Sequence, residues 1–341
     1  MAGARACIPT IPWPCGTAIA WPAIFMCGTA PVLKYRSEPL RCTMRRKYGA
    51  SSIANTCVDR IDQYLRRDDR KVENRAMTTM TLQALYRYPV KSLRGEDLHS
   101  HAVDARGLVG DRRWMVVDDS GRFLTQRQQA RMALVDARLD DEGLLHLAAP
   151  GMPLLAVVRS RPEPLEVSVW SDRVNAESAG PEADAWLSQF IGQPCRLVHM
   201  PDAERRAVDP DYATVDDQVG FADGFPFLLI SQGSLDDLNS RLERPLPMLR
   251  FRPNLVVGGC APYAEDGWRR IRIGELEFRV AKPCSRCVIP TIDFVTGERG
   301  REPLQTLMTY RRRDAKIYFG QNLIHDGCGR LERGMPVEVL A

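Results

Sequence analysis

Residues 282–287 read KPCSRC and place two thiols three positions apart, with an arginine between them. The stretch follows a predicted β-hairpin, in which residues 270–273 and 276–280 alternate apolar and polar side chains. The next segment, residues 288–292, is again extended in character. A thioredoxin-like redox pair lies where a strand meets a helix. The position of KPCSRC between extended segments therefore disfavours a redox disulfide.

Three other interpretations of the two thiols remain open from their spacing. A structural zinc site needs four nitrogen or sulfur ligands, and no second C-x-x-C follows at finger spacing, although His325 and Cys328 could be recruited. The thiols could also be inert and packed. Alternatively, one thiolate binds a soft or high-valent metal, and the charges of Lys282 and Arg286 would favour its ionised form.

The composition is that of an ordinary globular protein. The chain has 341 residues, 44% of them hydrophobic and 26% charged, which predicts two domains or one large domain with extensions. The net charge of +4 is too small to argue for nucleic-acid binding. No long uninterrupted apolar run predicts a membrane span. The ten scattered cysteines predict a reducing compartment, which we take to be a bacterial cytoplasm.

Residues 1–79 differ from the rest of the chain. They carry 13 basic and 6 acidic side chains and lack regular alternation. We interpret them as a disordered extension or a mis-assigned upstream start, with the folded protein beginning near Met77 or Met80. An organelle-targeting presequence is the alternative, because the segment is rich in arginine and poor in acidic residues to about residue 58.

Short strands and frequent turns characterise residues 80–175. Residues 82–90 form a strand-like stretch, and RWMVV at 113–117 predicts a buried strand. The DDSG that follows has turn chemistry, with a return arm at 122–125. Residues 144–147 and 165–170 alternate similarly. This pattern predicts a β-barrel-like domain over residues 80–175.

Residues 176–341 are predicted to form a second domain that is mainly β. Ala183, Trp186, Leu187 and Phe190 make one apolar helix face before Gly192. Residues 225–230 and 254–257 predict buried strands, and Ser231 supplies a helix start. The whole chain is therefore expected to be mainly β with some α, of the α+β class.

Six motifs occur in a fixed order: YPVKSLRG (88–95), GDRRWMV (110–116), LTQRQ (124–128), FRPN (251–254), CSRC (284–287) and FGQN (319–322). Together they resemble MOSC-domain molybdenum proteins with an N-terminal MOSC β-barrel. That group includes the mitochondrial amidoxime-reducing component and the bacterial YcbX-like proteins. The resemblance covers about residues 80–341, and implies a MOSC N-terminal β-barrel domain at 80–175 followed by a MOSC β-barrel domain at 176–341.

The resemblance also implies the molybdenum cofactor, Mo-molybdopterin, and a set of site residues. Cys287 is similar to the family's molybdenum ligand, and Cys284 would lie near the cofactor. Asp223 is similar to an acidic position close to the metal. Cys287 and Asp223 are therefore the candidate catalytic residues. The residues implied to bind the cofactor are Lys91, Ser92, Arg112, Arg252, Asn254, Arg286 and Asn322. From the residues alone, Asp223 could be a turn residue and the basic side chains ordinary solvated charges.

The implied activity is two-electron reduction of small N-hydroxylated compounds such as amidoximes and hydroxylaminopurines. After the C-x-x-C only Cys328 remains, so we expect no iron–sulfur domain and a separate electron donor, a flavoprotein reductase with a ferredoxin or a haem protein. The alternative is a cofactor-binding carrier without reductase activity. In the related cofactor sulfurases, a separate pyridoxal-phosphate domain performs the sulfur transfer.

Overall fold

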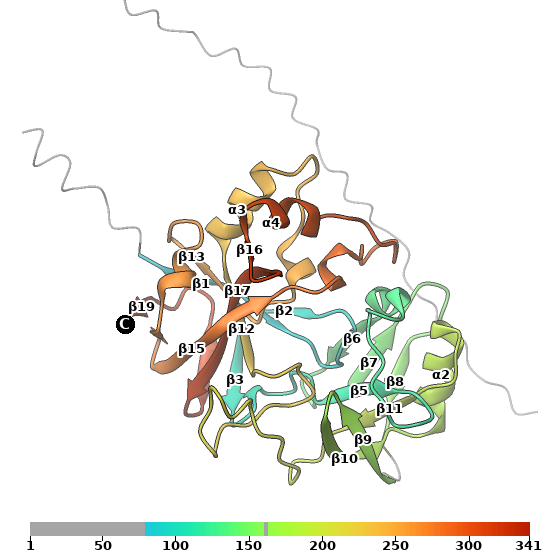
Figure 1. Cartoon of the computed structure of the whole chain (residues 1–341). Helices are drawn as coiled ribbons and strands as arrows, with labels where there is room; N and C mark the ends of the chain where they lie inside the picture. Colours follow the sequence, from blue (N-terminus) through green and yellow to red (C-terminus); the bar gives the residue numbers. More distant parts are fainter. Residues whose placement is uncertain (1–78, 160–162) are drawn as a thin grey trace, which may run out of the picture. The chain divides into compact units, whose positions relative to one another are not determined.

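The computed structural model describes residues 79–159 and 163–341 of the chain (Figure 1). The predicted N-terminal extension, up to residue 78, lies outside the described residues. The largest sheet of the described part has nine strands, in the order β19-β14-β15-β17-β12-β13-β1-β2 with β16 beside β17. Its strands are β1 (Thr81–Arg87), β2 (Glu96–Leu98), β12 (Phe227–Ser231), β13 (Leu255–Gly258), β14 (Arg270–Ile273), β15 (Leu276–Ser285), β16 (Arg312–Arg313), β17 (Lys316–Asp326) and β19 (Val337–Val339).

Three smaller sheets and three α-helices complete the described residues. One sheet contains β5 (Trp114–Val117), β9 (Pro164–Val169), β10 (Asp172–Ser178) and β11 (Arg196–His199). A second contains β3 (Ser100–Asp104), β4 (Gly107–Leu108) and β18 (Gly329–Glu332). The third contains β6 (Asp136–Leu139), β7 (Leu145–Ala148) and β8 (Leu155–Val157). The helices are α2 (Pro181–Ile191), α3 (Gln232–Ser240) and α4 (Leu304–Tyr310).

The expected mainly β architecture with some α is confirmed, and several local patterns predicted their elements correctly. All four residues of β5 are buried, as the apolar run at 113–117 predicted. The hairpin of β14 and β15 pairs Ile273 with Leu276. The turn after β5 is present, but the predicted return arm is only a bridge between Val117 and Phe123, so no full strand follows.

Strands from the first and last thirds of the chain are paired with each other. β1 is antiparallel to β13, and β3 is antiparallel to β18. The predicted domain boundary between residues 175 and 176 falls inside β10, whose partner β11 also pairs with β5. Hydrogen bonds between strands therefore cross that boundary. The division into domains at residues 175 and 176 stays a prediction. The first strands contribute to the same sheet as the segment that carries the two thiols.

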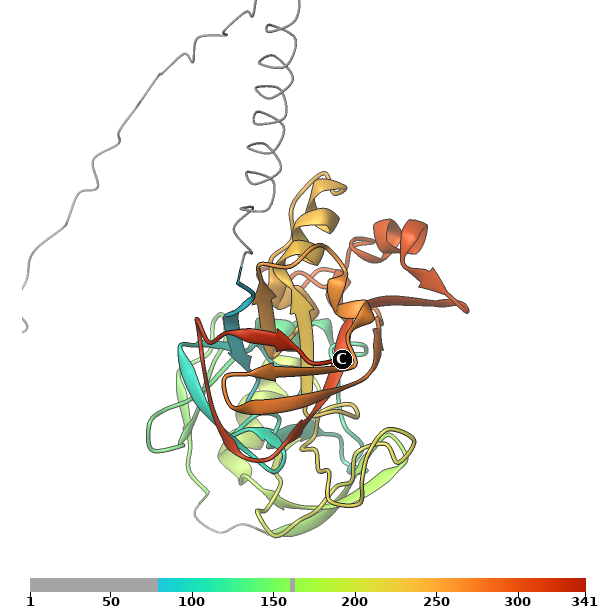
Figure 2. The same cartoon turned by 90° about the vertical axis from the view of Figure 1, so that its left-hand side faces the viewer.

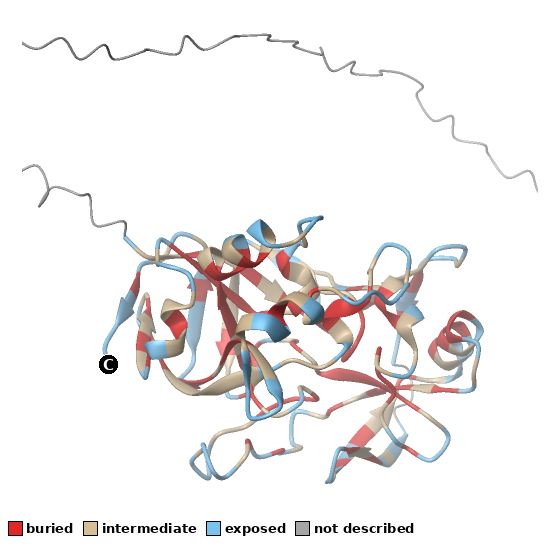
Figure 3. Cartoon of the chain, turned by 45° about the horizontal axis from the view of Figure 1, so that its top comes forward, coloured by how far each residue is buried: buried red, intermediate tan, exposed pale blue. Residues whose placement is uncertain are grey.

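Buried side chains form separate cores on the two sides of this arrangement (Figure 3). One core joins β1 to the C-terminal strands through Leu85, Phe227 and Phe278. Another core packs α2 against the smaller sheets through Trp186 and Leu197. Within the described ranges, no helix is both long enough and apolar enough to cross a bilayer.

The KPCSRC stretch continues directly from the hairpin. β15 extends through Cys284 to Ser285 and pairs with β17, where Lys282 faces Asn322 and Ser285 faces Tyr318. The register shifts twice along this pair, once on each side of Lys282 and Pro283. These irregularities, which resemble β-bulges, bend the strand where the thiols begin. Figure 2 shows β17 continuing beyond the body of the sheet toward β16.

Ser231 begins α3, as its position after a buried strand predicted. Its hydroxyl accepts a hydrogen bond from the backbone N–H of Ser234 at 3.1 Å. The carboxylate of Glu265 accepts from the Ser231 N–H at 3.0 Å and from the Ser234 hydroxyl at 2.7 Å. The helix therefore starts in a buried and mostly satisfied polar cluster.

Replacing Ser231 with alanine is expected to lower the free energy of unfolding by about 1 kcal/mol, because the N-terminal cap is lost. Urea unfolding followed by far-ultraviolet circular dichroism measures the change. The control is Gln232→Ala, at the partly exposed first residue of α3, which should cost less than about 0.5 kcal/mol. Equal losses in the two variants would mean that the cap contributes nothing measurable.

Candidate functional site

One pocket brings together all nine site residues that the sequence predicted. It has a cavity volume of about 150 Å³ and lies where the loops after β1, β5 and β15 meet the loop that precedes β12. Its lining includes Lys91, Ser92, Arg112, Asp223, Arg252, Asn254, Arg286, Cys287 and Asn322, and also Cys284 and Arg127. Residues more than 190 positions apart in the chain thus share one cavity.

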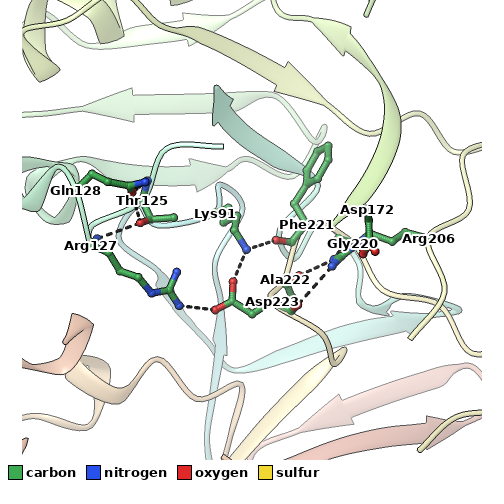
Figure 4. Close-up of polar contacts among 10 residues, drawn as sticks. All are labelled: Lys91, Thr125, Arg127, Gln128, Asp172, Arg206, Gly220, Phe221, Ala222 and Asp223. Atoms are coloured by element: carbon green, nitrogen blue, oxygen red, sulfur yellow. Dashed lines mark hydrogen bonds and ion pairs between the residues drawn. The ribbon is translucent and has the colours of Figure 1, made fainter. Parts of the chain in front are cut away.

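Asp223 accepts hydrogen bonds from two cations of the N-terminal segment (Figure 4). Lys91 Nζ lies 2.5 Å from Asp223 Oδ1, and Arg127 Nη2 lies 2.8 Å from Oδ2. Lys91 Nζ also donates to the backbone carbonyl of Phe221 at 2.7 Å. The side chain of Asp223 is 53% exposed and lines the pocket, whereas that of Lys91 is only 5% exposed. This pairing connects the segment after β1 to the loop before β12.

Burial and charge act in opposite directions on these groups. Burial lowers the pKa of Lys91 to about 8, although the Asp223 carboxylate acts to raise it. Burial acts to raise the pKa of Asp223, but Lys91 and Arg127 outweigh it and hold that pKa well below its usual range. Asp223 is therefore an anion at neutral pH. Lys91 is mostly protonated at pH 7 and can exchange a proton slightly above it.

Arg206 holds the loop that carries Asp223. Its guanidinium donates to the carbonyls of Gly220 at 2.8 Å and Ala222 at 2.6 Å, and to the carboxylate of Asp172 at 2.8 Å. Figure 4 shows it on the side of this loop opposite Arg127. Arg206 is buried, so these bonds satisfy donors that would otherwise be costly. It acts as a positioning residue for Asp223.

Two arginines of the pocket lie over one tyrosine ring. The guanidinium carbons of Arg112 and Arg252 are 4.2 and 4.3 Å from the centroid of the fully buried Tyr88 ring. The Tyr88 hydroxyl donates to the carbonyl of Pro253 at 3.1 Å. Burial and then the nearby charge of Arg112 lower the pKa of Arg252 to about 10, so it remains a cation at neutral pH. A Cβ at Gly95 would clash with the Tyr88 ring, which explains the glycine of the 88–95 motif.

Asn254 is a connector as well as a lining residue. Its Oδ1 accepts from Arg112 Nη1 at 3.0 Å, and its Nδ2 donates to the carbonyl of Tyr86 at 3.1 Å and to Asp111 at 3.2 Å. Asp111 in turn accepts from Arg112 at 2.6 Å. These bonds set the direction of the Arg112 side chain toward the pocket.

Three residues that line the pocket have a strained backbone conformation. Ser92, Arg112 and Arg252 have φ values of 66°, 46° and 58°, in the left-handed region that favours glycine. Such conformations cost free energy and persist where the surrounding contacts impose them, commonly at binding sites. The strain therefore supports a binding role for these three residues rather than a role as ordinary solvated charges.

The two thiols have different cationic neighbours. Arg286 Nη1 donates to Cys284 Sγ at 3.2 Å, and its Nη2 donates to the carbonyl of Phe251 at 2.7 Å. Cys287 instead lies near Arg127. Burial acts to lower the pKa of Arg127, but Asp223 and Cys287 outweigh burial and raise it. Lys282, which the sequence suggested as a neighbour of the thiols, pairs with Asp209 at 3.1 Å. Both cysteines are free and partly buried.

The chemistry of the lining fits an anionic group that carries a soft metal. Five cations line the described pocket, Lys91 and four arginines, against the single carboxylate of Asp223. Arg286 Nε is buried without a hydrogen-bond partner, so a donor is left over for a ligand. Over the described ranges, no three His, Cys, Asp or Glu side chains are grouped to hold a metal ion. One thiolate plus ligands from an organic group is a donor set suited to a soft metal.

Arg127 and Arg206 are the functional candidates that the sequence did not single out. Arg127 lies in the LTQRQ motif at 124–128, which contributed to the resemblance but gave this arginine no role of its own. Arg206 had no local signal, because the carbonyl groups it binds are 14 and 16 residues away. Asn322 was predicted, and its Nδ2 donates to the carbonyl of Lys282 at 3.3 Å, beside the thiol segment.

The chain is similar to known proteins over most of its described length. Residues 79–194 match the MOSC N-terminal beta barrel domain, and residues 216–338 match the MOSC domain. Mitochondrial amidoxime-reducing component 1 of Mus musculus is 36% identical over 280 residues, covering 76% of this chain and 82% of the relative. The Homo sapiens protein of that name is 36% identical over 282 residues, covering 76% and 83%. A molybdenum cofactor sulfurase of Oryza sativa is 33% identical over 270 residues, covering 72% of this chain but 32% of the relative.

Replacing Asp223 with asparagine is expected to move the pKa of Lys91 from about 8 to a lower value. The sign follows because the carboxylate stabilises the charged form of the amine, while burial disfavours it. A pH titration of Lys91 Nζ by NMR measures the midpoint. The control is Asp209→Asn, which removes the carboxylate beside Lys282 and should leave the Lys91 midpoint unchanged. An unchanged midpoint in Asp223→Asn would contradict the pairing.

Proposed function

The chain belongs to the MOSC-domain family that includes the amidoxime-reducing components, and we propose that it is a molybdenum-cofactor-dependent reductase of N-hydroxylated compounds. The observation that carries the proposal is the pocket itself. Two thiols, a carboxylate and five cations converge there, from segments that are distant in the sequence. Amidoximes and hydroxylaminopurines are the proposed substrates, and their reductive detoxification is the proposed role.

The proposed cofactor is Mo-molybdopterin, an anionic group. Lys91, Arg112, Arg252 and Arg286 would neutralise its phosphate, because Arg forms strong charge-assisted hydrogen bonds to such oxygens. Ser92, Asn254 and Asn322 would supply polar contacts from three different segments. Cys287 would bind molybdenum through its thiolate. Cys284 has a separate partner in Arg286, which favours a neighbouring rather than a ligating role.

When bound, the cofactor would supply the two-electron oxygen-atom transfer chemistry. The protein residues bind, orient and balance charge. Reducing an amidoxime to an amidine consumes two electrons and two protons and releases one water molecule. Lys91 Nζ, with its pKa lowered to about 8, can exchange a proton near neutral pH, whereas Asp223 remains ionised and keeps Lys91 and Arg127 in position.

The two electrons for each turnover would come from a separate protein, a flavoprotein reductase with a ferredoxin or a haem protein. We further propose that the protein acts in a bacterial cytoplasm, with an organelle as the alternative. Mass spectrometry of the native N-terminus distinguishes these locations, because import would leave a chain cleaved within residues 1–79.

Replacing Cys287 with serine is expected to abolish molybdenum retention and the reduction of benzamidoxime or 6-hydroxylaminopurine by an artificial electron donor. The physical reason is the loss of the only proposed protein thiolate on the metal. Metal analysis and product formation are measured on the same preparation. Cys284→Ser should retain molybdenum, and Cys328→Ser, at an exposed position, should match the wild type. Wild-type turnover by Cys287→Ser would refute the assignment.

A cofactor carrier without reductase activity is the second candidate, favoured by the similarity to the cofactor sulfurase. The two functions differ in how the cofactor is held. An enzyme is expected to keep molybdenum through gel filtration and to turn over benzamidoxime. A carrier is expected to transfer the cofactor to an apo-enzyme acceptor and to show no turnover with the artificial donor.

A further inference from the structure

Trp170 is an exposed aromatic residue beside the pocket and has no role in the site described above. Its side chain belongs to the turn between β9 and β10, and the residue is 53% exposed. It lines a groove of about 1390 Å³ that also contains Arg127, Asp223 and Cys287, which the pocket shares. The groove is therefore the approach to the pocket, and Trp170 stands on it.

The backbone at Trp170 is unfavourable for a tryptophan. Val169 pairs with Asp172, so Trp170 and Ser171 form a two-residue hairpin turn. Trp170 has a φ of 57°, and glycine is the residue that a positive φ at the first position of such a turn favours. A bulky side chain with positive φ is a rare outlier. The conformation of the turn does not require an indole side chain, so a role outside the turn accounts for the tryptophan at this position.

The indole is held in place by residues of the site. The Arg127 guanidinium carbon lies 5.0 Å from its ring centroid, and the same guanidinium binds Asp223 at 2.8 Å. The ring of Phe123 meets it edge-on, with centroids 5.0 Å apart and an interplanar angle of 63°. These contacts limit the movement of the indole while half of the side-chain surface stays open to the groove. A positioned and exposed aromatic face is a stacking platform.

We propose that Trp170 forms an aromatic subsite that binds the planar ring of an N-hydroxylated aryl or heteroaryl substrate while its N–O group enters the pocket. This proposal rests on the proposed function, and it names a residue that would favour the aromatic members of the proposed substrates. A ring stacks on the indole with little regard to its substituents, since every aromatic group has a π-face. The cofactor would fill most of the pocket, so only the small N–O group enters its mouth near Cys287, and the groove of about 1390 Å³ has room for the ring system. Arg127 links the two regions because it contacts Trp170 and Asp223 at once.

The test compares Trp170→Gly with the wild type on two amidoximes. Glycine suits the positive φ, so the thermal midpoint of the variant should be unchanged or higher. KM for benzamidoxime is expected to rise about tenfold, a typical loss for one aromatic contact. KM for acetamidoxime, which has no ring, should stay within about twofold, because an aliphatic substrate gains no stacking contact. Trp170→Tyr should restore most of the preference for the aromatic substrate.

A binding measurement separates this proposal from the reductase activity. Calorimetry with benzamidine, the product of benzamidoxime reduction, is carried out on wild-type protein and on Trp170→Gly, both as purified. Weaker benzamidine binding by the variant supports the subsite even if neither protein reduces an amidoxime. The absence of amidoxime reduction would count only against the proposed reductase activity. Equal benzamidine affinity, or equal increases in KM for both amidoximes, would overturn the subsite.

Discussion

The ion pairs of Asp223 are the interaction on which the pocket depends. This carboxylate accepts from Lys91 and Arg127, which belong to the N-terminal part of the described chain. Asp223 itself is on a loop that Arg206 fixes through the carbonyls of Gly220 and Ala222. Lys91 is buried, so its charge needs a nearby anion, and removing one partner of such a pair leaves an uncompensated charge. The pairing therefore holds together two segments that both line the pocket.

A cationic pocket is costly to fold, and the cost is offset by specific contacts. Arg252 is partly buried beside another arginine, and this burial lowers its pKa. The ring of Tyr88 lies under both guanidinium groups and offers its negative face to them. Positive φ values at Ser92 and Arg112 add strain close by. The pocket therefore favours an anionic ligand, because a bound anion would reduce the repulsion between the neighbouring cations.

Local patterns in the sequence predicted the elements that local burial determines. The apolar run at 113–117 became β5, and Ser231 became the cap of α3, because each depends on neighbours within a few residues. The grouping of the pocket residues was implied by the family resemblance that the six motifs carry together, and not by any one motif. The partners of the charged groups could not be predicted in this way. Lys91 and Asp223 are 132 residues apart, and only the folded chain brings them together.

The pairing of strands across the chain also explains why the domain boundary is hard to place from sequence. Alternating segments before residue 175 predict a self-contained barrel, yet β1 joins the sheet of β13 and β3 pairs with β18. Strand pairing over long sequence separations leaves no compositional mark, since each strand keeps the same apolar alternation whichever partner it takes.

The difference between the two thiols follows from the same long-range pairing. By spacing, Cys284 and Cys287 are equivalent members of a C-x-x-C. In the structure, Cys284 lies within β15, one residue before its end, and receives a hydrogen bond from Arg286, whereas Cys287 lies beyond the strand and near Arg127. Arg127 is fixed from the opposite side by Asp223. The environment of Cys287 is therefore coupled to the central ion pairs and to Trp170 on the groove, while that of Cys284 depends on its own strand.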